Sequence, residues 1–397
     1  MKFPSPGDLP EQKGLVDPFL RPDGTRVESA EDWHIQRCES IKLLQHYIYG
    51  QTPDLPDHLG MTIEKDEEVF GGKASRQLFT LSCEHKGYPA DLRVGLIVPP
   101  KGGPFPVVIK NDAYRFDRQE VSDAKRRKQY ADAPRDDVEM GVFEEAVSRG
   151  YAICKFIRTD WADDTPESRD RGIYPLFPEC DWGAIAVWAW TFSVVIDWLE
   201  TNPKIDTDHV IVTGHSRGGK TALAAGILDE RICVTAPNSS GGGGTGSYRV
   251  FKPGLREQRI ANQLKSFPHW WHPRFFEFAE REDHLPFDAH TMKALVAPRL
   301  LFNAHALQDD WANPYDTQFT YEADQCVYEF LGVWERQGVH WREGGHAQSS
   351  IDWMALLDFC DVHFRVVERE RSFDTLPFEY SDEHRKQLDT YRKHFRR

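Results

Sequence analysis

Residues 210–223 read VIVTGHSRGGKTAL and contain two overlapping motifs that serve different chemistries. Gly214 to Gly218 form G-x-S-x-G, the nucleophile elbow of an ester or amide hydrolase, with Ser216 at its tip. Gly214 to Thr221 also form G-x-x-x-x-G-K-T, a loop that cradles phosphate groups. Both motifs follow an apolar strand and open a helix, so the rest of the chain must decide between them.

A phosphate-binding loop works together with a second strand that ends in an acidic residue, which holds Mg²⁺. Two apolar runs lie downstream of the loop, at 233–236 and 299–303. The first leads into Pro237-Asn238 and the second ends in Asn303, so neither supplies the carboxylate. The sequence therefore favours the hydrolase.

An elbow hydrolase carries its acid and then its histidine after the serine along the chain. The run 299–303 leads to the adjacent Asp309 and Asp310, and His346 follows a pair of glycines further on. A serine hydroxyl needs a base within hydrogen-bond reach, and a carboxylate fixes the tautomer of that base. We therefore predict Ser216 as the nucleophile, His346 as its base and either Asp309 or Asp310 as the acid.

A tight turn around the serine explains the small residues beside it. Gly214 and Gly218 stand where a side chain would collide with neighbouring backbone. The backbone N–H of Arg217 is predicted to face the developing oxyanion, with a second donor from residues 111–114. His215 is interpreted as a packing residue that points away from the serine.

Short apolar runs alternate with helix-length segments over most of the chain. This alternation predicts crossover connections and a mostly parallel sheet with helices on both faces. Runs at 76–83 and 92–98 predict a preceding antiparallel hairpin, so the expected fold class is α/β, an α/β-hydrolase fold with an N-terminal antiparallel hairpin. The apolar runs of the parallel part are 105–110, 152–157, 210–212, 233–236 and 299–303.

Two helices are also clear in the sequence. Ser29 is placed as the N-cap of the first. The segment from Trp182 to the break at Asn202-Pro203 is apolar nearly all round, which predicts a deeply buried helix. We predict three parts: an N-terminal arm and helix over 1–70, a catalytic domain over 71–371, and a charged C-terminal tail over 372–397. The tail is expected to form a surface helix with its Lys and Arg in solvent.

The composition excludes several classes of function. The 397 residues carry 49 Lys and Arg against 63 Asp and Glu, a net charge of -14, which opposes binding to nucleic acid or to an anionic membrane. The seven cysteines include no C-x-x-C pair, and neither a metal nor another cofactor is predicted. No apolar run approaches about 18 residues and no leader segment is visible, so the expected location is the cytoplasm. The expected partner is a small-molecule or oligosaccharide ester, and the sequence leaves the oligomeric state open.

The stretch GHSRGGK resembles the G-C-S-R-x-G-K signature of the glucuronoyl esterases, carbohydrate esterase family fifteen. Similar stretches include SSGGGGTGSYRV and REGGHAQSSIDW. The resemblance implies a serine-dependent α/β-hydrolase that needs no metal and cleaves the ester between a 4-O-methyl-glucuronic acid carboxyl and an alcohol. It further implies that Arg217 stabilises the oxyanion, that Lys220 holds sugar hydroxyls and that Trp311 lies against the uronate.

The chain departs from the family pattern at three points. His215 replaces the cysteine before the nucleophile, and Ser239 stands where fungal members carry the triad glutamate. The acid must therefore come from Asp309 or Asp310. The family is typically secreted, whereas no signal peptide is visible here. Two alternatives stay open: deacetylation of a sugar by the same triad, and a non-catalytic carbohydrate-binding relative.

Overall fold

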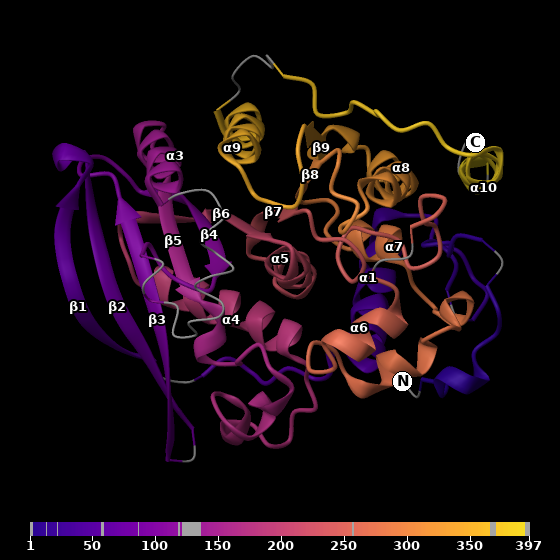
Figure 1. Ribbon diagram of the computed structural model, residues 1–397, viewed down its shortest axis with the longest axis horizontal. Helices are drawn as coiled ribbons and strands as arrows, with labels where there is room; N and C mark the ends of the chain where they lie inside the picture. The colour runs from indigo at the N-terminus through magenta and orange to yellow at the C-terminus, as the bar shows by residue number, and fades with distance from the viewer. Residues whose placement is uncertain are drawn as a thin grey trace.

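One sheet connects most of the protein, with its strands in the order β1-β2-β3-β5-β4-β6-β7-β8-β9 (Figure 1). The computed structural model describes residues 3–12, 14–21, 23–56, 59–85, 87–117, 120, 136–255, 258–365 and 371–393. The strands are β1 (Leu59–Val69), β2 (Ala74–His85), β3 (Tyr88–Val98), β4 (Phe105–Asp112), β5 (Ala152–Ile157), β6 (Ile205–His215), β7 (Ile232–Asn238), β8 (Leu300–Ala306) and β9 (Gln337–Arg342). The helices are α1 (Ala30–Leu44), α3 (Asp136–Ser148), α4 (Ala184–Leu199), α5 (Arg217–Leu228), α6 (Ile260–Ser266), α7 (Ala289–Ala294), α8 (Pro314–Phe330), α9 (Ser350–Arg365) and α10 (Asp382–Lys393).

The sheet has an antiparallel part and a parallel part. β1, β2 and β3 pair antiparallel in sequence order, and β3 pairs antiparallel with β5. From β5 onward, in the order β5-β4-β6-β7-β8-β9, each adjacent pair of strands is parallel. The predicted α/β-hydrolase fold class is confirmed, and β2 and β3 form the predicted hairpin. The carboxyl ends of the parallel strands share one edge of the sheet, which is where ligands bind in sheets of this kind.

Each apolar run found in the sequence lies within a strand, except that the run 299–303 begins one residue before β8, and the run 152–157 coincides with β5. The sequence carries no signal that predicts β1 or β9. β1 is an edge strand whose residues are mostly exposed, so it contains no apolar run. β9 is short and is defined by its pairing with β8, which only the folded chain brings beside it. β1 also lies within the segment 1–70 that the sequence analysis assigns to an arm and a helix.

Helices cover both faces of the parallel part of the sheet (Figure 1). α3 and α9 contact each other on one face, where Phe143 and Trp353 join a buried cluster with Ile153 of the sheet. α4, α5 and α8 contribute to the larger cluster on the other face. The sheet edge that carries the candidate residues is therefore held by two packed layers.

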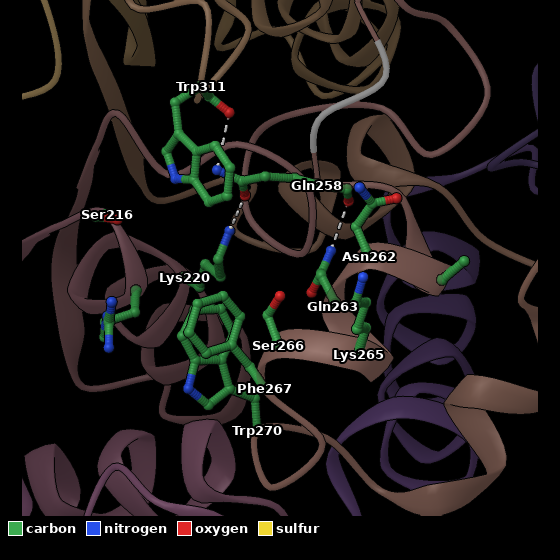
Figure 2. A pocket seen from close by; sticks show the side chains of 12 residues that line it. Ser216, Lys220, Gln258, Asn262, Gln263, Lys265, Ser266, Phe267, Trp270 and Trp311 are labelled. Atoms are coloured by element: carbon green, nitrogen blue, oxygen red, sulfur yellow. Dashed lines mark hydrogen bonds between the residues drawn. The ribbon is translucent and has the colours of Figure 1, made fainter.

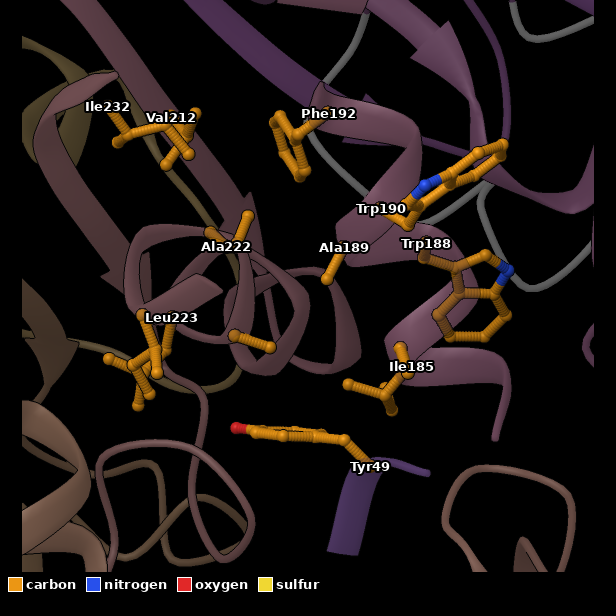
Figure 3. Close-up of a cluster of buried hydrophobic side chains, with 14 of the residues drawn as sticks. Tyr49, Ile185, Trp188, Ala189, Trp190, Phe192, Val212, Ala222, Leu223 and Ile232 are labelled. Carbon is orange, nitrogen blue, oxygen red and sulfur yellow. The ribbon is translucent and has the colours of Figure 1, made fainter. Parts of the chain in front are cut away.

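α4 and α5 form the centre of the larger cluster (Figure 3). Every residue of α4 except Ser193 and Asp197 is buried, as its apolar sequence predicts. Ala189 of α4 and Ala222 of α5 both belong to this cluster, and the two helices contact each other. This packing fixes α5, and with it the turn that holds Ser216. No helix in the described ranges, α4 included, has the length and apolar content to cross a bilayer.

The two ends of the chain contain the expected helices. α1 begins at the predicted N-cap, where Ser29 Oγ accepts a hydrogen bond from the N–H of Asp32 at 3.1 Å. α10 buries Tyr391, and its Arg392 Nη1 donates to Glu322 Oε2 of α8 at 3.0 Å. The expectation that the basic residues of the tail stay in solvent is wrong for Arg392, because α8 supplies an ion-pair partner.

Candidate active site

Ser216 lies at the turn between β6 and α5 in a strained backbone conformation. Its φ is 58° and its ψ is -119°, which residues with a side chain rarely adopt. A Cβ atom on Gly214 would lie 2.6 Å from Asn111 Nδ2, and one on Gly218 would lie 2.9 Å from Asn111 Oδ1. Both glycines of the motif are therefore required by the close approach of Asn111.

The two adjacent aspartates lie in different surroundings. His346 Nδ1 is 2.8 Å from Asp309 Oδ2. Burial disfavours the charged form of Asp309, but the hydrogen bond and the charge of His346 outweigh it and lower the pKa of this carboxyl. Asp310 is exposed, and its Oδ1 lies 3.2 Å from the Nζ of Lys252. The structure brings Asp309 to the imidazole and directs Asp310 to a surface lysine.

The contact with Asp309 determines which imidazole nitrogen can act as a base. An ionised carboxylate only accepts hydrogen bonds, so Nδ1 of His346 carries a proton, and in the neutral ring the lone pair is on Nε2. The imidazole packs against the ring of His215, the residue before Ser216, with 4.5 Å between ring centroids. Within the described residues the Ser216 hydroxyl makes no hydrogen bond. In unliganded enzymes such contacts are often long and tighten when substrate binds.

His215 has a defined tautomer. Asn238 Nδ2 donates to the Ala304 carbonyl at 3.2 Å, so its Oδ1 accepts from Nδ1 of His215 at 2.7 Å. Burial and the proximity of His346 lower the pKa of His215 to about 3, and the ring is therefore neutral at ordinary pH. The predicted packing role of His215 includes a contact that the sequence does not reveal, because its ring lies against that of His346.

α5 begins at Arg217, whose main-chain N–H is in the first turn of the helix. N–H groups of a first turn have no intrahelical acceptor and attract negative charge. The position suits the predicted oxyanion contact. In the segment 111–114, Asn111 lies under the elbow and its Nδ2 donates to the Gly218 carbonyl at 3.0 Å. A second oxyanion donor from this segment stays a prediction.

A pocket of about 430 Å³ opens beside Ser216 (Figure 2). Trp311 and the pair Phe267 and Trp270 lie on opposite sides of Lys220 in this view. None of the described lining residues is acidic, and three are basic. The lining residues are Ser216, Arg217, Lys220, Gln258, Ala261, Asn262, Gln263, Lys265, Ser266, Phe267, Trp270 and Trp311.

One buried carboxylate organises the aromatic wall of the pocket. Asp164 pairs with Nη1 of Arg217 and accepts from Nε2 of His269 and Nε1 of Trp270, both at 2.9 Å. Phe267 and Trp270 stack at 3.9 Å, and the Arg217 guanidinium lies 5.1 Å from the Trp270 ring. Although burial disfavours ionisation, these hydrogen bonds and charges lower the pKa of Asp164. The Arg217 side chain is thereby held against the wall.

Lys220 is buried at the floor of the pocket with all three ammonium protons directed at protein oxygens. Nζ donates to the carbonyls of Ser240 and Gly242, the latter at 2.6 Å, and to Gln258 Oε1 at 2.6 Å. Burial, together with the charge of Arg217, lowers the pKa of Lys220 to about 7. The three oxygen acceptors oppose this loss of charge.

Several lining residues carry no signal in the sequence. Gln258 bridges two predicted residues, since its Oε1 accepts from Lys220 and its Nε2 donates to the Trp311 carbonyl at 2.9 Å. Asp164 follows β5 and resembles any acidic loop residue in sequence. Its role depends on contacts with Trp270 more than 100 positions later, where the WW pair in FPHWWHPRF is the visible signal.

A serine at a strand-to-helix turn, beside a histidine held by a carboxylate, is typical of the serine ester hydrolases of the α/β-hydrolase fold. Comparison with known proteins identifies the family within this class. Residues 131–332 match a family model described as fungal glucuronyl esterase. Carbohydrate esterase MZ0003 from an unknown prokaryotic organism is 32% identical, with 88% of this chain and 89% of that protein covered. The 4-O-methyl-glucuronoyl methylesterase of Schizophyllum commune is 29% identical, with 87% and 79% covered.

The solved structures agree with these matches. The glucuronoyl esterase of carbohydrate esterase family 15 from Caldicellulosiruptor kristjansonii has a TM-score of 0.77 and 31% identity, with 97% of this chain and 98% of that chain covered. The chain belongs to the glucuronoyl esterase family and is a carboxylic ester hydrolase, as the sequence resemblance implies.

Proposed function

We propose that the protein hydrolyses esters between the carboxyl group of 4-O-methyl-glucuronic acid and an alcohol, through an acyl-enzyme on Ser216. The observation that carries the proposal is the 2.8 Å contact of His346 Nδ1 with Asp309 Oδ2, beside the strained turn at Ser216. Relatives named 4-O-methyl-glucuronoyl methylesterase support the acyl group. The basic lining of the pocket supports it as well, because the acyl group leaves as a uronate anion.

The residues have the following roles in this proposal. Nε2 of His346 removes the proton of Ser216 while Oγ forms a bond to the acyl carbon. Asp309 stabilises the resulting imidazolium, and the N–H of Arg217 donates to the oxyanion. The bond to the alcohol oxygen then breaks, and His346 returns the proton to that oxygen. In the second half of the reaction, His346 removes a proton from water while the water oxygen bonds to the acyl carbon. The bond to Ser216 Oγ then breaks, His346 returns the proton to Oγ, and the uronate is released.

The pocket walls supply contacts for the sugar. The half-exposed indole of Trp311 offers a flat apolar surface opposite Trp270. Lys220 can donate to a sugar hydroxyl when that hydroxyl replaces Gln258 Oε1 as its acceptor. The substrate in this proposal is therefore held by an aromatic wall and one buried cation.

The substrate assignment is tested by comparing benzyl glucuronate, an acetylated xylose and 4-nitrophenyl acetate as substrates of the wild-type enzyme and of Ser216→Ala. We expect kcat/KM to be highest for benzyl glucuronate and all three activities to vanish in the variant. A higher kcat/KM for the acetylated sugar would contradict the glucuronate ester as substrate and would indicate a sugar deacetylase with the same nucleophile. Activity that persists in Ser216→Ala would contradict the proposed acyl-enzyme on Ser216.

The proposed base is tested separately by labelling the folded protein with a fluorophosphonate. This reagent modifies a serine that has been activated by a neighbouring base. We expect rapid labelling of the wild-type enzyme at Ser216 and none in His346→Ala. An unlabelled wild-type protein would favour the non-catalytic carbohydrate-binding relative.

A further inference from the structure

A buried arginine holds the segment that carries His346. Arg342 is the last residue of β9, and its side chain is 6% exposed. Its Nη2 donates to the carbonyl of Gly345 at 3.2 Å and to the carbonyl of Ala347. The residues on both sides of His346 are therefore bound by one guanidinium nitrogen. We call residues 343–349 the histidine loop.

The other nitrogens of the same guanidinium extend this attachment. Nη1 of Arg342 donates to the Glu343 carbonyl at 3.0 Å, and Nε donates to Asp352 Oδ2 at 2.7 Å. Asp352 lies in the first turn of α9, is buried, and also accepts from the N–H of Ser349 at 2.7 Å. The two residues together bind both ends of the histidine loop and connect it to α9.

The histidine loop is also tied to the segment that carries Asp309. The N–H of Gln308 donates to the Gly344 carbonyl at 3.2 Å, and Gln308 Oε1 accepts from the N–H of Gly344 at 2.6 Å. Gly344 has a φ of 105°, which only glycine adopts without strain. A loop with two glycines has many conformations when free, so these contacts select one of them.

We propose that Arg342 and Asp352 are positioning residues that hold the imidazole of His346 between Ser216 and Asp309. The inference rests on the proposed role of His346 as the base. A guanidinium is required because its planar fork binds several carbonyls in fixed directions, whereas an ammonium presents one point of charge. Neither residue lines the pocket, so replacing either one should change kcat and leave KM nearly unaltered.

The experiment compares Arg342→Lys and Asp352→Asn with Arg299→Lys as a matched control. Arg299 precedes β8 at the opposite edge of the sheet and also donates to main-chain carbonyls: those of Asp229 at 3.1 Å, Ile232 at 2.8 Å and Gly226 at 2.5 Å. Each variant is measured for kcat and KM with benzyl glucuronate, for the rate of fluorophosphonate labelling and for Tm. His346→Ala is carried in parallel.

We expect Arg342→Lys and Asp352→Asn to lower kcat and the labelling rate by about tenfold to a hundredfold, because a small displacement of a catalytic group costs this much. KM is expected to change less than twofold, and Arg299→Lys to lower Tm with kcat unchanged. Wild-type kcat in both Arg342→Lys and Asp352→Asn, or an equal loss of kcat in Arg299→Lys, would overturn the inference. Labelling retained in His346→Ala would instead overturn the proposed base, and the positioning role with it. If either Arg342→Lys or Asp352→Asn does not fold, the other variant tests the inference, since both change the contact between Arg342 and Asp352.

Discussion

At the scale of single residues, Asp309 and Asp310 share one turn of backbone but differ in environment. Asp309 is 2% exposed and lies against His346, whereas the Asp310 side chain is 60% exposed and lies near Lys252. A buried carboxylate that accepts from an imidazole both orients the ring and stabilises its charge. An exposed carboxylate near a lysine contributes little to either.

We therefore expect Asp309→Asn to lower kcat on the order of 10⁴-fold, because an amide can donate to Nδ1 and favour the wrong tautomer of His346. Asp310→Asn should retain kcat within about twofold, since its Lys252 contact lies at the surface. The measurement is kcat for benzyl glucuronate with both variants at one pH. Equal losses in the two variants would contradict the assignment of Asp309 as the acid.

The sequence predicts Ser216 and His346 because each stands in a recognisable local pattern. It leaves Asp309 and Asp310 undecided, because which of two neighbours faces the histidine depends on contacts such as that of Gln308 with Gly344. It also predicts a packing role for His215 but not that its ring lies against that of His346. Contacts between residues far apart in the chain have no local signature.

At the scale of elements, the strand-to-helix turn at β6 and α5 requires space that only glycine leaves. A Cβ on Gly214 would meet the Gly218 carbonyl and lie 2.6 Å from Asn111 Nδ2. All of these atoms are main chain or buried, so none can move aside easily. The apolar run 210–212 and the G-x-S-x-G motif after it predict this turn from the sequence. β1 could not be predicted in this way, because an exposed edge strand needs no apolar residues.

We expect Gly214→Ala to destabilise the protein by about 1–3 kcal/mol or more through overpacking. Gly141→Ala is the matched control, because Gly141 lies in α3 with no atom within 4 Å of a built Cβ. Alanine there should stabilise by about 0.5–1 kcal/mol, since it lowers the entropy of the unfolded chain. Urea unfolding measures both changes. An unchanged free energy of unfolding in Gly214→Ala would contradict this prediction and show that the turn shifts to make room for the methyl group.

At the scale of the whole molecule, three buried histidines link stability to pH. Burial is the first cause in each case, and it lowers the pKa of His215 and His305 to about 3 and that of His290 to about 4. Each is then neutral in the folded protein at a pH where the unfolded chain, with a histidine pKa of about 6.5, binds a proton. Their contribution to stability is complete above about pH 6.5 and is lost as pH falls toward 4.

The free energy of unfolding should therefore fall between pH 6 and 4.5 in the wild-type protein. His290→Gln should reduce this slope by about 1.4 kcal/mol per pH unit, because one proton fewer is taken up on unfolding. His290 lies away from the pocket, and glutamine can still donate to the Val16 carbonyl that its Nε2 contacts at 2.8 Å. Denaturant unfolding at several pH values gives the slopes. An unchanged slope in the variant would show that His290 titrates alike in both states.

Ser239 occupies the position at which the sequence resemblance places a glutamate in fungal members. It is buried at the end of β7, its hydroxyl has no partner in the described part of the chain, and its N–H donates to the Ala304 carbonyl of β8 at 2.9 Å. On the proposed assignment the acid instead follows β8, the neighbour of β7 in the sheet. A search that required a glutamate at the position of Ser239 would therefore miss a protein whose acid follows β8.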